Sequence, residues 1–118
     1  GAGKRVELRC PDPAANPYLV LAVCLEAGLD GIRNQITPPD AVTENVFEMQ
    51  LQQRAKLGIE SLPGDLEQAV EELEKDDYIK SVLGGHITEK YLEAKRAEWA
   101  DYRAQVTEWE IEKYLYKI

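Results

Sequence analysis

The sequence has few of the residue types that mark specialised classes of protein. It contains two cysteines and one histidine, with no CxxC or Cys/His spacing, so neither a zinc site nor a disulfide framework is indicated. Its main apolar run, residues 18–25, is far shorter than the roughly 20 residues of a membrane-spanning helix. Fourteen Lys and Arg against 22 Asp and Glu leave a net charge of -8, which repels nucleic-acid backbones and anionic membrane surfaces. We therefore expect neither nucleic acid nor a membrane as a partner.

What is present matches an ordinary globular composition. Hydrophobic residues make up 44% of the 118 residues and charged residues 31%, which argues against disorder. The length suits one domain or part of one. Residues 1–3 resemble an expression-tag remnant, and no apolar stretch of a signal peptide follows them. We therefore expect a cytoplasmic protein in which Cys10 and Cys24 are buried free thiols.

Residues 4–10 alternate polar and apolar side chains with a period of two. This period predicts a half-buried β-strand, and no other part of the sequence predicts one as well. A strand leaves unpaired N–H and C=O groups along both edges. A single strand in a helical chain therefore implies partner strands that this chain does not supply.

The next element predicted is a helix over residues 17–34. Asn16 offers an N-cap, and Pro17 suits the first helical position because its missing N–H costs nothing there. Residues 18–25 are apolar on every side, as expected for a helix that is buried all round. Such a helix needs more cover than a chain of this size easily gives.

The rest of the chain predicts four more helices and one irregular region. Asp65 and Gln68 resemble a capping box at the start of a helix over 65–75, and Thr107 and Glu110 match one before a C-terminal helix. Between them, we expect a short helix over 77–83 that ends at Gly84-Gly85. A long polar helix is expected from 87 to about 106. Residues 40–62 are predicted to be irregular, with one helical turn near 51–57. The predicted fold class is mainly α with one N-terminal β-strand.

The strongest chemical signal lies in the predicted strand. A period of two places Arg5, Glu7 and Arg9 on one face, with neighbours roughly 7 Å apart. A carboxylate between two guanidiniums suits a site for phosphate and a divalent metal, because the carboxylate holds a hard cation and the arginines bind anions. The alternative is a solvated face whose charges pair among themselves. Spacing alone favours this alternative.

Other candidate residues have simpler interpretations. His86 has no second imidazole or cysteine nearby and is interpreted as a surface or helix-start residue. The acidic run 71–77 lacks the order of a calcium loop, so we interpret it as a solvated helix end. Ser61 and Ser81 have no His/Asp order around them, and the aromatic residues of the last two helices fit packing. By itself the chain shows no complete catalytic site.

Several segments together are similar to one protein family. Residues 5–19 contain the string Arg-x-Glu-x-Arg-x-Pro-Asp-Pro-x-x-Asn-Pro-Tyr-Leu, and Ala27–Asn34 and Pro38-Pro39 follow it. Gly58–Pro63, Glu98-Trp99 and Trp109-Glu110 also fit. From 4 to 118 the chain resembles the C-terminal part of bacterial type I glutamine synthetase. The resemblance implies a C-terminal fragment of that α+β catalytic domain, ending in an amphipathic docking helix at 108–118.

The resemblance implies an ATP-dependent ligase that joins ammonia to glutamate through γ-glutamyl phosphate. ATP is then a co-substrate, and two or more Mg or Mn ions are cofactors. Glu7 resembles a metal ligand, Arg9 the arginine that holds glutamate, and Arg5 an arginine that faces ATP phosphate. The family's other metal ligands lie upstream of Lys4, so the chain alone is expected to be inactive and to bind no cofactor tightly.

The resemblance also implies partners. The family forms a homododecamer of two stacked rings, in which the C-terminal helix docks into the opposite ring. An apolar stripe with helical spacing suits such docking. Contact with a nitrogen-regulatory transcription repressor is left open. The stripe comprises Ile111, Tyr114, Leu115 and Ile118.

Two alternative functions remain open at this point. A related γ-glutamyl-amine ligase would share these motifs, because the residues that select the amine lie mostly upstream. The other alternative belongs to a different class and is a stand-alone helical protein-interaction module. Under it the charged face of residues 5–9 would be incidental.

Overall fold

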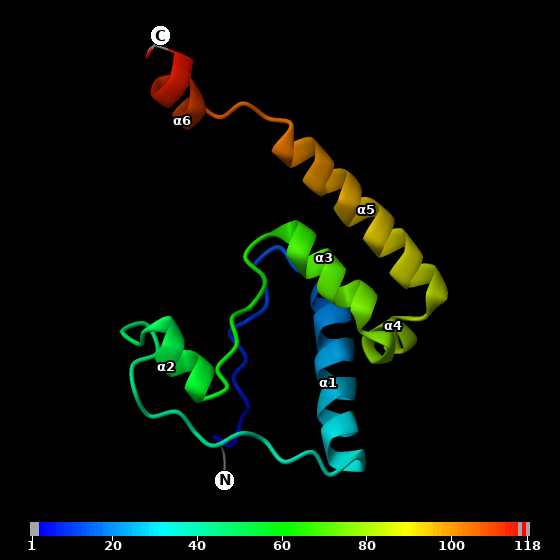
Figure 1. The fold of residues 1–118 in the computed structure, drawn as a ribbon. Helices are drawn as coiled ribbons and strands as arrows, with labels where there is room; N and C mark the ends of the chain where they lie inside the picture. The colour runs from blue at the N-terminus through cyan, green and yellow to red at the C-terminus, as the bar shows by residue number, and fades with distance from the viewer. Residues whose placement is uncertain (1–2, 116, 118) are drawn as a thin grey trace.

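The computed structural model describes residues 3–115 and 117, and it is a helical assembly with long irregular connections (Figure 1). Helices α1, α3, α4 and α5 lie together, while α2 and the C-terminal turns lie apart from them (Figure 1). The predicted helical class is confirmed. The elements are α1 (Pro17–Arg33), α2 (Leu51–Lys56), α3 (Leu66–Lys75), α4 (Asp77–Leu83), α5 (Gly85–Arg103), α6 (Glu108–Glu110) and a π-helical turn η1 (Ile111–Leu115).

The predicted N-terminal strand is wrong for this chain. Residues 4–10 have no regular secondary structure, and no strand occurs anywhere in 3–115. Val6, which the pattern places on the inner face, is 96% exposed. The physical reason is that a strand is stabilised by hydrogen bonds to a neighbouring strand, and none of the described residues provides that neighbour. Cys10 ends this segment and is exposed, while Cys24 is half-buried, so the expected burial of both thiols is wrong for Cys10.

Helix α1 begins and ends close to the predicted residues. The Asn16 side chain accepts hydrogen bonds from the backbone N–H of Tyr18 at 3.0 Å and of Leu19 at 3.3 Å. These bonds satisfy two of the N–H groups that a helix start leaves unpaired. After the last helical residue, the Asn34 side chain donates to Asp30 Oδ1 at 2.7 Å.

Helices α3 and α4 are each capped by an aspartate side chain. Asp65 accepts from the backbone N–H of Gln68 at 2.8 Å, and the Gln68 amide donates back to Asp65 at 3.0 Å. Asp76, rather than the following aspartate, caps α4 through the N–H of Ile79 at 2.9 Å. The predicted bounds of both helices agree with the structure to within one residue.

The junction of α4 and α5 differs from the prediction. Gly84 has a φ of 78°, a left-handed conformation that glycine adopts without steric cost, and it closes α4. Gly85 does not share this role, because α5 already begins there, two residues earlier than predicted. At its other end α5 stops at Arg103 rather than near residue 106.

Helices α3 and α5 are joined by charged pairs and a small apolar interface. The Arg96 guanidinium contacts Glu74, and Arg103 lies 3.9 Å from Glu67. Helix α1 contacts α4 on the other side of this layer. A cavity of about 170 Å³ lies between the elements and is lined by Ala15, Asn16, Leu19, Val20, Val23, Leu73, Ile79, Leu83 and Tyr91.

The described residues enclose a very small core. Only Met49, Val70 and Thr88 among them are buried, and the radius of gyration is 18.8 Å, against about 13–14 Å for a compact domain of this length. The expectation that α1 is buried all round is therefore wrong within this chain. Its residues Tyr18 and Leu25 are mainly exposed, because the layer of α3, α4 and α5 covers only one of its sides.

The C-terminal residues form two short turns instead of one regular helix. The predicted capping box is present: Glu110 N–H donates to Thr107 Oγ1 at 3.2 Å, and Thr107 N–H donates to Glu110 Oε2 at 2.8 Å. Helix α6 then passes into η1 after three residues. Of the docking helix expected over 108–118, residues 108–115 form a capped turn followed by a π-helical turn. Residues 116 and 118 lie outside the described residues.

No helix in the part of the chain that the structure describes is long and apolar enough to cross a membrane.

Candidate functional site

The charged residues singled out from the sequence lie on an accessible segment. Arg9 Nε contacts Glu7 Oε1 at 2.5 Å, and both side chains are exposed. The two residues are two positions apart in the sequence, and their contact places both side chains on the same side of the backbone. Arg5 is exposed on the same segment. This ion pair is compatible with both interpretations of the sequence. It can be a solvated charge pair, or it can form part of a site for an anion and a metal ion.

A short ordered turn ties this segment to α1. Within it, the backbone N–H of Ala14 donates to Asp12 Oδ1 at 2.7 Å, and Ala15 N–H donates to the Asp12 carbonyl at 2.9 Å. Prolines at positions 11, 13 and 17 restrict the backbone further. The turn then ends in the Asn16 cap of α1. The turn therefore joins the charged segment to the start of α1.

The chemistry of this segment is that of one hard oxygen ligand beside two anion-binding groups. The Glu7 carboxylate is the kind of donor that Mg²⁺ and Mn²⁺ prefer, and guanidiniums bind carboxylates and phosphates in a bidentate manner. Within residues 3–115 no group of three or more His, Cys, Asp or Glu side chains is arranged to hold a metal ion. Glu7 fits a metal site as a single ligand.

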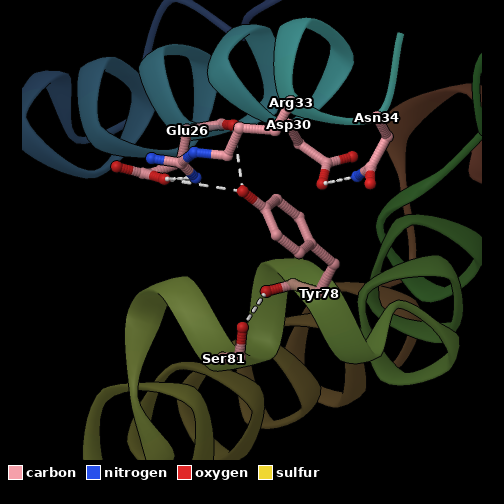
Figure 2. Close-up of polar contacts among 6 residues, drawn as sticks. All are labelled: Glu26, Asp30, Arg33, Asn34, Tyr78 and Ser81. Atoms are coloured by element: carbon pink, nitrogen blue, oxygen red, sulfur yellow. Dashed lines mark hydrogen bonds and ion pairs between the residues drawn. The ribbon is translucent and has the colours of Figure 1, made fainter. Parts of the chain in front are cut away.

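Sequence reasoning missed a polar cluster between α1 and α4 (Figure 2). Tyr78 of α4 points toward α1 and donates from its hydroxyl to the Glu26 carbonyl oxygen at 3.1 Å, with Glu26 Oε2 at 3.5 Å. The same carboxylate pairs with Arg33 at 3.1 Å. The sequence did mark Glu26, because this charged residue directly follows the apolar run of α1. Nothing in the sequence marked Tyr78, which lies 52 residues away, as its partner.

The remaining candidates have ordinary structural roles. The Ser81 hydroxyl donates to the carbonyl of Tyr78 at 2.7 Å, as helix serines often do. Ser61 and His86 are exposed. In the acidic run, Glu72 pairs with Lys75 and Asp77 with Lys80, each at 2.8 Å. The interpretation of this run as a solvated helix end is therefore confirmed.

The apolar residues proposed for docking are accessible where they are described. Ile111, Tyr114 and Leu115 of η1 are all exposed. Tyr114 packs edge-on against Trp109 with ring centroids 5.8 Å apart. These side chains are free to contact a partner, and their docking role stays a prediction.

Comparisons with known proteins identify relatives of this chain. The chain is 52% identical over 117 residues to a glutamine synthetase of Clostridium saccharobutylicum and 52% identical over 116 residues to one of Thermotoga maritima, covering 99% and 98% of this chain. It covers 26% of each relative, and thus spans about a quarter of their length. A solved structure described as "Apo GmaS without ligand" superposes with a TM-score of 0.72 at 41% identity, over 92% of this chain and 24% of that one.

A family model also matches nearly the whole chain. The model described as "Glutamine synthetase, catalytic domain" matches residues 1–114, a range that includes the charged segment, the capped helix α1 and the layer of α3, α4 and α5. The chain therefore belongs to the glutamine synthetase catalytic-domain family.

Proposed function

We propose that this chain forms one part of the active site of an ATP-dependent ligase that makes glutamine from glutamate and ammonia through γ-glutamyl phosphate. The observation that carries the proposal is the family match over residues 1–114, because that range includes the Arg-x-Glu-x-Arg segment. Relatives named glutamine synthetase share about half of its residues. The chain spans a quarter of their length, so the remaining parts of the site come from polypeptide outside it.

The charged segment supplies three groups to that site. Glu7 is proposed as a ligand of Mg or Mn, which in such a site neutralises charge on the nucleotide phosphates. Arg9 is proposed to hold the glutamate substrate, and Arg5 to face an ATP phosphate. Guanidiniums suit these roles because they bind planar anions through two parallel hydrogen bonds. The exposure of all three side chains leaves them accessible to such ligands.

The partners follow from the same proposal. We propose that the complete protein is a cytoplasmic homododecamer, in which Ile111, Tyr114 and Leu115 dock on a neighbouring subunit. Their exposure beyond the helical layer supports this role. Ile118, the fourth residue of the predicted stripe, lies outside the described residues. Contact with a transcription repressor remains an open prediction.

A related γ-glutamyl-amine ligase is the second candidate function. The similarity to the structure described as "Apo GmaS without ligand" is the observation that keeps it in view. The higher identity to relatives named glutamine synthetase, 52% against 41%, favours ammonia as the acceptor. An interaction module without catalytic relatives is disfavoured by the family match.

The test uses a complete enzyme, either the natural full-length protein or a chimera in which this chain replaces the matching quarter of the Thermotoga maritima relative. Glu7→Gln keeps the shape of the side chain and removes its charge. We expect ADP release dependent on glutamate and ammonia to fall by at least about 100-fold, the scale on which loss of one charge-stabilising group acts. Glu89→Gln, at an exposed position on α5, is the matched control and should change little.

Two results would contradict the proposal. Near-normal turnover of Glu7→Gln at saturating Mg²⁺ would remove the metal role. Unchanged turnover of Arg5→Ala and Arg9→Ala would remove the site as a whole and favour an interaction module. Mass spectrometry of the product with ammonia and, separately, with ethylamine as acceptor distinguishes the two ligases.

A further inference from the structure

Helix α1 is attached to the helical layer by one hydrogen bond from a distant residue. The Tyr78 hydroxyl donates to the backbone carbonyl of Glu26 at 3.1 Å (Figure 2). That carbonyl lies in the middle of α1, where it also faces the ordinary helical N–H. The carboxylate of Glu26 lies 3.5 Å from the same hydroxyl and is held by Arg33. The contact thus joins the middle of α1 to the first turn of α4.

The phenol remains a donor over the whole physiological range. Burial raises the pKa of Tyr78 above its ordinary value, and the nearby carboxylates of Asp30 and Glu26 add to this effect. A protonated hydroxyl can donate to only one acceptor at a time. The shorter distance assigns that acceptor to the backbone carbonyl of Glu26.

The start of α1 lies at the apolar cavity beside the helical layer. Ala15 and Asn16, just before the helix, line the apolar cavity together with Tyr91 of α5. The hydrogen bond that Lys95 donates to the Glu98 carboxylate is the main cause that raises the pKa of Lys95, and the charge of Asp12, in the same turn, makes the smallest contribution. Ala15 and Asn16 of the turn that carries the charged segment therefore border the same cavity as α5.

Together these contacts connect the helical layer to the charged segment. We propose that Tyr78 is a positioning residue that fixes α1 on α4 and, through the ordered turn at 11–16, places Arg5, Glu7 and Arg9 in the site. The inference rests on the proposed function and adds a residue far from the reacting groups. Without the hydroxyl, α1 exchanges between docked and displaced positions, and only the docked position presents Glu7 correctly. The apparent affinity for metal then falls in proportion to the docked fraction.

The test is Tyr78→Phe in the same complete enzyme, which removes one oxygen and keeps the ring. Loss of one neutral hydrogen bond shifts such an equilibrium by about two- to ten-fold. We expect the Mg²⁺ concentration for half-maximal activity to rise by about that factor, while kcat at saturating Mg²⁺ stays within about two-fold. Amide hydrogen exchange in residues 19–33 should become faster. Tyr102→Phe, an exposed tyrosine stacked on Trp99, is the control and should change neither.

A second variant separates the two acceptors on the same residue. Glu26→Gln removes the charge that pairs with Arg33 and leaves the backbone carbonyl in place. If the carbonyl is the anchoring acceptor, this variant should shift the Mg²⁺ dependence less than Tyr78→Phe does.

The inference has distinct ways to fail. An unchanged Mg²⁺ dependence in Tyr78→Phe, or a fall in kcat with no change in Mg²⁺ dependence, would overturn it. A Tyr78→Phe protein that does not assemble would also overturn it, because the hydroxyl would then be needed for folding rather than positioning. Loss of activity in Glu7→Gln together with a normal Tyr78→Phe enzyme would remove this inference and leave the proposed function intact. Activity of Glu7→Gln equal to wild type would instead overturn the proposed function.

Discussion

Val70 in α3 is 5% exposed, whereas Val6 in the N-terminal segment is 96% exposed. Both valines occupy the apolar positions of an amphipathic pattern, one with a helical period and one with a period of two. The helical pattern finds its cover in α5, which returns along α3 within the same chain (Figure 1). The alternating pattern finds no neighbouring strand in the described residues.

The difference shows that the sequence period defines which side chains share an apolar face. Whether that face is buried depends on the element that packs against it. A helix satisfies its own backbone hydrogen bonds and needs only side-chain cover. A strand needs a partner for its backbone as well as for its side chains. The helical layer is therefore formed within this chain, whereas residues 4–10 have neither a strand partner nor side-chain cover among the described residues.

The largest expected effect comes from placing a charge at each of these two valines. In the 118-residue chain, Val70→Asp buries an unpaired carboxylate and should reduce the free energy of unfolding by about 3 kcal/mol. Val6→Asp should change it by less than about 0.5 kcal/mol, as at other exposed positions. Urea unfolding followed by circular dichroism measures both.

The same pair of variants can test in a complete enzyme whether Val6 and Val70 still differ in burial. There Val6→Asp should become strongly destabilising as well, if polypeptide outside this chain covers Val6. Equal tolerance of Val6→Asp in the chain and in the complete enzyme would show that this segment is exposed in both.

A smaller effect is expected at the start of α3. Asp65→Ala removes the side chain that accepts from Gln68 N–H and should cost about 1 kcal/mol, as is usual for an N-cap. Faster amide exchange in residues 66–69 measures the loss. Asp40→Ala, an exposed aspartate outside any helix, is the control. Equal exchange in the two variants would mean that α3 depends on its packing against α5 and not on its cap.

The smallest effect concerns the C-terminal turn. The backbone N–H of Thr107, with its hydroxyl, bonds to the Glu110 carboxylate and lowers the pKa of that carboxyl below its ordinary value. Because the folded turn favours the ionised form, its stabilising contribution is complete above the ordinary pKa of glutamate, about 4.3. It is lost as the pH falls through the lowered value.

This pH dependence can be followed at a single amide. The NMR shift of the Thr107 N–H should titrate with a midpoint below about 4.3, and Glu110→Gln should abolish that titration. A midpoint at the ordinary value would show that the capping box is not formed in solution, and the C-terminal region would then resemble residues 4–10 more closely than the helical layer.

Helix positions were predictable because their signals are local. Asn16 followed by Pro17, and Asp65 followed by Gln68, each lie within one helical turn of the N–H groups that they satisfy. The end of α5 at Arg103 was predicted three residues too late, since no glycine or proline marks it. Gly85 was assigned to a closing pair, although one left-handed residue, Gly84, is enough to reverse the chain there.

The polar residues of the candidate site also differ in how far they could be predicted from the sequence. Arg5, Glu7 and Arg9 were identified from a spacing of two residues and from family resemblance, and the Glu7–Arg9 ion pair lies within that spacing. The contact between Tyr78 and Glu26 spans 52 residues. No local pattern encodes such a distance, because it depends on how α4 lies across α1.

By itself the sequence determined most of the helices, several of their caps, the charged triplet and the family, since these depend on neighbouring residues or on a linear string. Only the tertiary structure decided that residues 4–10 form no strand, that the helical layer covers only one side of α1 and that Tyr78 contacts α1. The physical reason is that burial and strand pairing require surfaces brought together from distant parts of a chain, whereas a capped helix completes most of its hydrogen bonds within a few residues.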